Sequence, residues 1–208
     1  MNAYSIALFL HVIGAITLFV GLGVLILANL ALRRVRRVEH LRALIGPLTA
    51  GRKIGFEHIS LVDLLVVAGV LLIGLSALYM VTSAWSFDVA WIRVAIVTTL
   101  LVAPLGPLLV NPRLLAIARA SETVSDGPLD VSLMARTHDP VLTSALSLMA
   151  STLVGVVFVM TNKPPALESI AAVGIAAFVG VAISAPAFER RRPPHALGPR
   201  SDPADEEP

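Results

Sequence analysis

The uncharged stretches of this sequence constrain its fold more than any other feature. Residues 3–32 contain no Asp, Glu, Lys or Arg, and about 20 apolar residues are enough for a helix to cross the ~30 Å hydrocarbon layer of a bilayer. Further apolar runs cover about residues 59–82, 91–110, 140–160 and 166–188. Because unpaired peptide groups are costly in hydrocarbon and the runs do not alternate as barrel strands do, each run predicts a spanning helix. We therefore predict an all-α, polytopic membrane bundle of about five transmembrane helices over residues 1–188, a four-helix core plus one.

The composition agrees with a membrane protein and excludes several kinds of chemistry. Hydrophobic residues make up 56% of the 208 residues and charged residues 14%, against roughly 45–50% and 25% in soluble domains. The chain has no cysteine, which excludes disulfides, thiolate nucleophiles and thiolate zinc or iron–sulfur sites. The sequence pI of about 9.5 does not indicate nucleic-acid binding, because the basic residues cluster beside the apolar runs, where positive charge sets membrane orientation.

Proline and capping residues predict where the helices break. Asp139 followed by Pro140 is typical of an N-cap and a first helical turn, and predicts the start of the fourth helix. Residues 161–165, with the sequence TNKPP, predict a tight break before the fifth helix. Pro104 and Pro107 lie inside the third run and predict a kink, because proline removes a backbone donor and clashes with the preceding turn.

The basic residues predict the direction of the chain. Seven of the sixteen lie in a basic connection over residues 33–54, three lie around the connection between the third and fourth helices, and four lie in the tail. With five crossings these fourteen share one side, and basic residues favour the cytoplasmic side. We predict a protein of the bacterial cytoplasmic membrane with its N-terminus outside, and a disordered cytoplasmic tail over residues 189–208. Trp85 and Trp91 then lie at the outer interface, where indole rings are enriched.

Four arginines directly follow the first apolar run: Arg33, Arg34, Arg36 and Arg37. We expect them to continue the first helix into the cytoplasm and to act as the orientation signal. They are also expected to attract anionic lipids, at ~1 kcal/mol for each basic residue near the surface. The lipid bilayer and its anionic lipids are therefore the first predicted partners.

His11 is the single residue that most invites a functional interpretation. It lies roughly 10 Å below the outer surface, at 1.5 Å per helical residue. Gly14 and Gly21 follow it on one face of the helix, and a face of small residues allows close helix contact. We therefore expect His11 to point into the bundle, where a buried ionisable residue is a functional candidate.

Two interpretations of His11 stay open on the sequence. The first is that it binds haem b or copper, with His58 or Met160 as an additional metal ligand. The second is a neutral histidine that is hydrogen-bonded to a neighbouring hydroxyl group. Counting residues from the membrane surface places four hydroxyl side chains and no second histidine at a similar depth: Thr98, Thr99, Ser151 and Thr152.

Five polar residues are expected near the cytoplasmic end of the bundle: Glu57, His58, Asp63, His138 and Asp139. Carboxylates and imidazoles in one layer can hold a divalent metal or relay protons. The alternative is an interfacial cluster that pairs with the nearby arginines. We favour the alternative, because the spacing matches none of the standard metal motifs.

Small residues follow one face of the fourth helix: Ser144, Ser147, Ser151 and Gly155. This spacing is typical of close helix packing, and a polar path for a solute is the functional alternative. Small-residue faces on the first, fourth and fifth helices also predict association with a second copy of the chain, as a homo-oligomer, or with another membrane protein.

Three segments resemble a bacterial family of predicted integral membrane proteins that has no assigned function. Residues 10–15, LHVIGA, resemble the family's LH-x-x-G opening; residues 111–114, NPRL, resemble its PRL junction; residues 158–164, FVMTNKP, resemble its M-x-x-K-P ending. The resemblance covers about residues 4–164 and implies a four-helix core, with the fifth helix and the acidic tail as departures. The histidine of the first helix also resembles that of copper-resistance D-type membrane domains and four-helix membrane haem proteins, which implies a fold analogy through His11 alone.

These observations leave three hypotheses of function. The sequence has no phosphate-binding glycine loop, nucleophile elbow or metalloprotease helix motif, which favours a non-enzymatic protein. The leading hypothesis is an integral membrane bundle that associates with other membrane components. The second is a haem b or copper protein that uses His11. The third is transport of a proton, ion or small solute through Asp63, His58 and the serine face.

Overall fold

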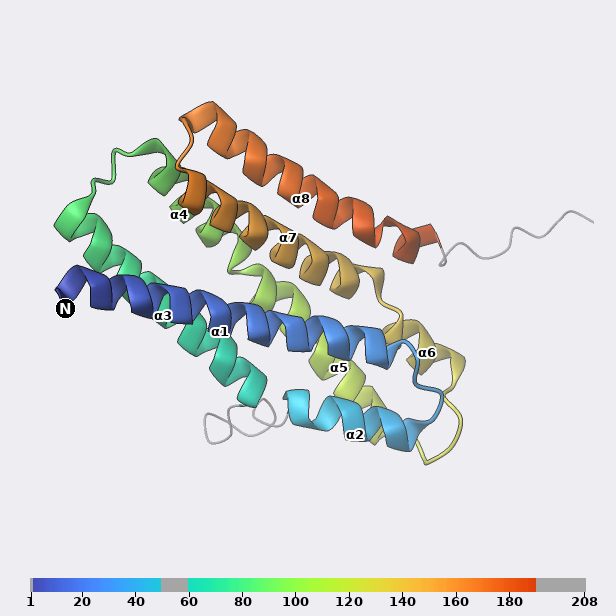
Figure 1. Cartoon of the computed structure of the whole chain (residues 1–208). Coiled ribbons are helices and arrows are strands. Elements are labelled where there is room, and N and C mark those ends of the chain that lie inside the picture. The colour runs from blue at the N-terminus through green and yellow to red at the C-terminus, as the bar shows by residue number, and fades with distance from the viewer. Residues whose placement is uncertain (1, 50–59, 190–208) are drawn as a thin grey trace, which may run out of the picture.

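The computed structural model describes residues 2–49 and 60–189, and this part of the chain is helical, with one isolated β-bridge between Arg37 and Pro128 (Figure 1). Five segments are long and apolar enough to cross a membrane: Ala3–Leu32, Leu61–Ala84, Ala90–Glu122, Val131–Asn162 and Ala166–Ala185. The predicted all-α bundle with five candidate spans is confirmed, while the predicted direction of the chain stays a prediction. Residues 50–59 of the basic connection and 190–208 of the tail lie outside the described residues.

The first two spanning helices begin at capped residues. α1 (Ala3–Leu32) starts after Asn2, whose side-chain Oδ1 accepts a hydrogen bond from the backbone N–H of Ser5 at 2.8 Å. α3 (Leu61–Ala84) starts after Ser60, whose Oγ accepts from the backbone N–H of Asp63 at 3.1 Å. Each cap satisfies one of the backbone donors that a helix leaves free at its first turn.

The third span is interrupted where the prolines predict a kink. α4 (Ala90–Val102) ends before Pro104, a π-helix (η3, Gly106–Val110) follows, and α5 (Asn111–Glu122) continues beyond the predicted end at residue 110. Irregular helical turns of this kind accommodate proline, which has no backbone N–H and leaves a carbonyl oxygen of the preceding turn without its helical partner. The predicted kink is confirmed, and the helix after it extends the span.

The last two spans form a hairpin. α7 (Pro140–Asn162) is capped by Asp139, whose Oδ1 accepts from the backbone N–H of Val141 at 3.0 Å. It ends at Lys163, which has left-handed backbone angles with φ of 52°. α8 (Ala166–Glu189) follows after Pro164 and Pro165. The predicted cap and the predicted break over residues 161–165 are both confirmed.

The connection after α1 differs from the prediction. α1 ends at Leu32, so the expectation that Arg33, Arg34, Arg36 and Arg37 continue the first helix is wrong. The chain turns instead into an amphipathic helix, α2 (Val38–Thr49), whose Val38 and Leu41 are fully buried. Burial of that apolar face against α5 favours the turn over a longer α1. Another short helix, α6 (Val131–Thr137), precedes α7.

The helices associate closely in two pairs, α1 with α3 and α7 with α8, both through glycine. A Cβ added at Gly69 of α3 would lie 2.8 Å from the backbone nitrogen of Leu18 and 3.0 Å from the carbonyl oxygen of Gly14. A Cβ added at Gly180 of α8 would lie 2.7 Å from the carbonyl oxygen of Ser147. The backbones therefore touch at these positions, as small residues allow in membranes.

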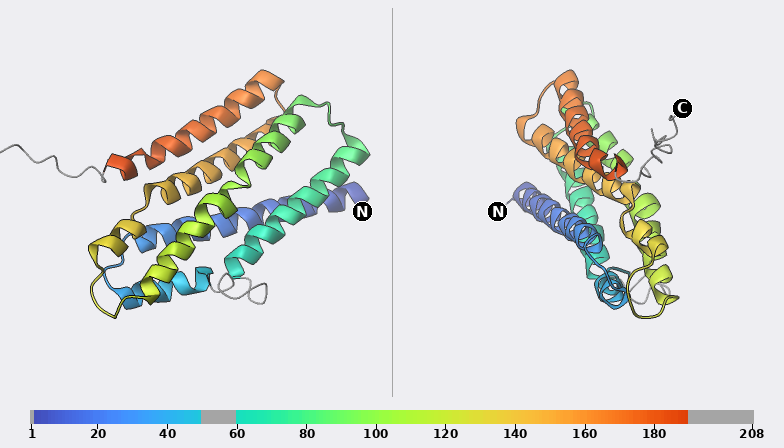
Figure 2. Two further views of the ribbon diagram at one scale, coloured as in Figure 1. Left: turned by 180° about the vertical axis from the view of Figure 1, so that it is seen from behind. Right: turned by 90° about the vertical axis from the view of Figure 1, so that its right-hand side faces the viewer.

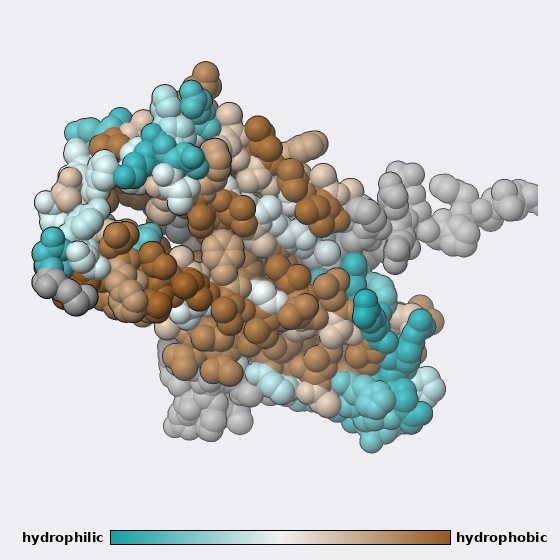
Figure 3. Space-filling view, in the orientation of Figure 1, coloured by the Kyte–Doolittle hydropathy of each residue, from teal (hydrophilic) through white to brown (hydrophobic). Residues whose placement is uncertain are grey.

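The buried core lies at one end of the bundle. It is formed by the second half of α1, by α2, η3 and α5, and by the first half of α7. At the other end, α3 packs on α1 while α4 packs on α7 and α8, so the helices form two groups that separate (Figures 1 and 2). Figure 3 shows an opening through the molecule between these groups, next to the loop that joins α3 to α4.

Candidate functional site

His11 lies on α1 and faces α3. Its Nδ1 is 3.2 Å from Oγ of Ser76, and Ser76 Oγ also donates to the carbonyl oxygens of Leu72 and Ile73. The close approach of Gly14 to α3, three residues further along α1, brings the two side chains together. A histidine paired with a neighbouring hydroxyl group is one of the two predicted interpretations. The partner is on α3, however, and is none of the four residues expected from depth alone.

The other predicted metal ligands are not gathered around His11 in the described residues. His58 lies outside them, and Met160 is on the last turn of α7 (Pro140–Asn162), whereas His11 faces α3. No group of three or more His, Asp or Glu side chains in the described part of the chain could hold a metal ion. The structure therefore provides no support for the haem b or copper hypothesis.

We expect the contact between His11 and Ser76 to contribute measurably to stability. In a double-mutant cycle of His11→Leu and Ser76→Ala, the coupling free energy should be about 0.6 kcal/mol, the average for side-chain hydrogen bonds between membrane helices. The measurement is reversible unfolding in mixed micelles. Ser83→Ala, on an exposed position of the same helix, is the control. A coupling free energy of zero would show that the two groups do not bond.

The predicted cytoplasmic cluster divides into separate local interactions. Asp63 accepts a hydrogen bond from Ser60 Oγ at 2.8 Å in the cap of α3. His138 ends α6, where its Nδ1 lies 3.0 Å from the carbonyl oxygen of Met134. Glu57 and His58 lie outside the described residues. The three described members take part in capping at separate places, and no group of three or more possible metal ligands forms in the described part of the chain.

Asp139 combines a cap with an ion pair. Its Oδ1 caps α7, and its Oδ2 accepts from Nε of Arg113 at 3.0 Å. Arg113 also donates from Nη1 to the carbonyl oxygen of Leu109 at 3.0 Å. Both side chains are mostly buried, with 20% of Asp139 and 29% of Arg113 exposed. The pairing with an arginine agrees with the predicted alternative and joins α5 to the start of α7.

We expect Asp139→Ala to lower the free energy of unfolding by about 1–2 kcal/mol, because it removes the helix cap and leaves Arg113 without its carboxylate. Asp139→Asn keeps an oxygen that can cap the helix, so its loss should be smaller than that of alanine. Thermal unfolding in detergent measures both. An equal loss in the two variants would show that the ion pair, and not the cap, carries the effect.

The small residues of α7 face α8. Ser144 Oγ lies 2.9 Å from Ser184 Oγ, and a Cβ added at Gly155 would lie 2.8 Å from Cβ of Ala176. Ser151 Oγ bonds to the carbonyl oxygen of Ser147 within its own helix. This face therefore packs two helices together, as predicted, and a solute path along it finds no support. This packing between α7 and α8 occupies the small-residue faces of both helices, for which the sequence also predicts association with partners.

The end of the bundle next to the opening carries an aromatic cluster; the sequence predicts that Trp85 and Trp91 share an interface, but it does not predict their contacts with Tyr4 and Lys163. The rings of Trp85 and Trp91 meet edge to face at a centroid distance of 5.3 Å. Trp85 donates from its indole nitrogen to Tyr4 Oη at 3.1 Å, and Lys163 Nζ lies 4.6 Å from the centroid of Trp85. The cluster joins the ends of α1, α3, α4 and α7, where the amphipathic rings suit a membrane–water interface.

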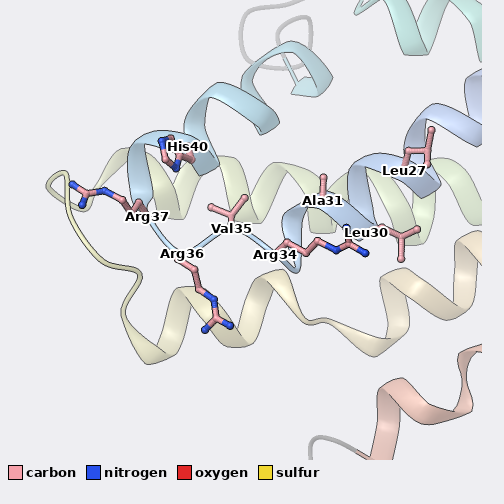
Figure 4. Close-up of a pocket in the computed structure, with 8 residues that line it drawn as sticks. All are labelled: Leu27, Leu30, Ala31, Arg34, Val35, Arg36, Arg37 and His40. Atoms are coloured by element: carbon pink, nitrogen blue, oxygen red, sulfur yellow. The ribbon is translucent and has the colours of Figure 1, made fainter.

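The arginines after α1 surround the turn into α2. Arg37 forms an ion pair with Glu39, and the backbone N–H of Glu39 together with the Arg37 guanidinium lowers the pKa of the Glu39 carboxyl group. Arg34 lies back along α1 toward Leu30, whereas Arg36 and Arg37 point away from the turn (Figure 4). Glu39 therefore neutralises the charge of Arg37 and does not pair with Arg34 or Arg36.

The fold defines a class, the helical bundle with several membrane-spanning helices. Comparisons with protein-family models, with curated proteins and with solved structures found no match. The family resemblance of residues 4–164 therefore stays a prediction.

Proposed function

We propose that this chain is a multi-pass protein of the bacterial cytoplasmic membrane, with its N-terminus outside, that acts by associating with another transmembrane helix and not by catalysis. The five apolar helices and the placement of fourteen of the sixteen basic residues support the location and direction. The opening between the two helix groups supports association, since packing within the described chain leaves it unfilled (Figure 3).

The first half of α1 carries the surface that this proposal needs. It exposes large apolar side chains on most of its turns, among them Phe9 at 60% and Ile16 at 55%. The contiguous core of the described residues begins at Leu22 on this helix. The part of the opening that lies within the hydrocarbon layer must be filled by lipid chains or by another helix, because neither water nor empty space is favourable there. We infer that the occupant is a helix of a second copy or of a partner protein.

Photo-crosslinking tests this proposal. A photoreactive residue is placed in turn at the exposed apolar positions of α1 between residues 6 and 20, and at Ile175 and Phe178 of α8 as controls on a lipid-facing helix. We expect protein adducts at one face of α1 and lipid adducts alone on α8. An adduct of twice the chain mass identifies a second copy, and any other mass identifies a different partner. Lipid adducts alone on α1 would contradict the proposal.

A further inference from the structure

A pocket of about 660 Å³ lies where α1 turns into α2. One side is apolar and is formed by Leu27, Leu30 and Ala31, which are on the last turns of α1 (Figure 4). Leu27 is 67% exposed and Leu30 is 47% exposed. The other side is basic and comes from the turn and from the start of α2: Arg34, Arg36, Arg37 and His40. The pocket lining thus joins a hydrocarbon surface to a group of cations and contains no acidic residue.

The cations of the pocket differ in how far they are neutralised. Glu39 pairs with Arg37. Arg34 and Arg36 make no hydrogen bond or ion pair with any residue that the structure describes. Two guanidinium groups of the pocket lining, Arg34 directed back along α1 and Arg36 directed away from the turn (Figure 4), therefore have no counter-charge from residues 2–49 and 60–189. A guanidinium group offers paired N–H donors that match the oxygens of a phosphate.

Arg34 also lies at a depth that suits a lipid phosphate. Helical side chains point toward the N-terminus of their helix, and Arg34 extends from the end of α1 back toward Leu30 (Figure 4). Leu30 belongs to the apolar span Ala3–Leu32. The guanidinium group is therefore brought to the level at which the apolar span ends, next to the headgroup layer that contains the phosphates of a bilayer.

We propose that this pocket binds one anionic phospholipid. Arg34 binds its phosphate, Arg36 binds the same phosphate after its side chain turns toward Arg34 from the direction seen in Figure 4, and Leu27 and Leu30 contact the upper part of an acyl chain. This proposal rests on the proposed function in one respect, the choice of leaflet: an N-terminus outside places the pocket in the cytoplasmic leaflet. It goes beyond a general attraction of the basic connection for membranes, because it assigns binding to two of the arginines and to an apolar wall.

The test uses the full-length protein in detergent, with native mass spectrometry and a titration of phosphatidylglycerol. We expect one phosphatidylglycerol molecule per chain and weaker retention of phosphatidylcholine. Arg34→Gln with Arg36→Gln should weaken phosphatidylglycerol binding about 30-fold, the change expected from the loss of two basic contacts near the membrane. Arg34→Lys keeps the charge but loses the paired donors, so it should weaken binding by a smaller factor.

The control variant is Arg119→Gln with Arg136→Gln. It removes the same charge from two exposed positions outside the pocket, so its affinity should stay within about twofold of the wild type. Equal weakening in the two double variants would overturn the proposal and leave a general charge effect. Displacement of the lipid by inorganic phosphate at equal concentration would also overturn it, because the apolar wall would then contribute nothing. All of these readings are independent of orientation, so a reversed topology changes the leaflet and not the binding.

Discussion

Gly180→Ala is expected to lower the free energy of unfolding by about 1–3 kcal/mol, the usual cost of overpacking a close contact. The added Cβ would lie 2.0 Å from Ser151 Oγ, 2.7 Å from the carbonyl oxygen of Ser147 and 2.9 Å from Cα of Leu148. Two of these atoms belong to the α7 backbone, so α7 and α8 must move apart. For a chain of this length the midpoint of thermal unfolding should fall by roughly 2–12 °C.

Gly174→Ala is the matched control on α8. No heavy atom lies within 4 Å of a Cβ added there, so the same chemical change should raise the unfolding midpoint by roughly 1–4 °C, because alanine is favoured over glycine inside a helix. Heating in detergent, followed by a measurement of the fraction that stays folded, gives both values. If Gly180→Ala were as stable as Gly174→Ala, the backbone contact between α7 and α8 would be wrong.

Gly69→Ala should have a comparable effect on the other helix pair. Its Cβ would lie 2.8 Å from the backbone nitrogen of Leu18 and 2.9 Å from Cβ of Leu18, so α1 and α3 must separate. We expect a loss of about 1–3 kcal/mol. Separation of the two helices should also break the contact between His11 and Ser76, because that contact depends on the same close approach of α1 to α3.

Two further variants sharpen the test on this pair. Gly74→Ala, on α3 with open space around its Cβ, should be close to neutral. Gly14→Ala combined with Gly69→Ala should cost less than the two single losses added together, because the first substitution has already moved the helices apart. Full additivity would show that Gly14 and Gly69 act at independent contacts, against the geometry described above.

Much of the fold follows from patterns that are local in the sequence. The uncharged runs predict the spans because the cost of unpaired peptide groups in hydrocarbon acts on each segment separately. The cap at Asp139 and the break at Pro104 also depend on neighbouring residues alone. The apolar runs do not predict α2, because it lies in a basic stretch that dominates the orientation signal. Its buried positions, Val38, Leu41 and Ile45, do follow the helical repeat and could have revealed it.

Less of the candidate site could be predicted, because it depends on which helices are neighbours. The sequence predicts that His11 points into the bundle, but residue depth does not select Ser76 as its partner, since the pairing of α1 with α3 is set by Gly14 and Gly69 together. The aromatic cluster joins Lys163 to Trp85 across a long stretch of chain, and no local pattern carries that information. The spacing of the small residues predicts packing surfaces, but it does not predict that α8 fills the face on α7.

Cysteine labelling of the two loops tests the central claim, that these helices cross a bilayer and place the two ends of the bundle on opposite sides. The chain has no native cysteine, so single cysteines can be introduced at two exposed positions, Ser86 between α3 and α4 and Ser125 between α5 and α6. With a maleimide that does not cross membranes, we expect Ser86→Cys to react in intact cells. We expect Ser125→Cys to react only after the cells have been permeabilised. Reaction of both in intact cells, or of Ser125→Cys and not Ser86→Cys, would contradict the account.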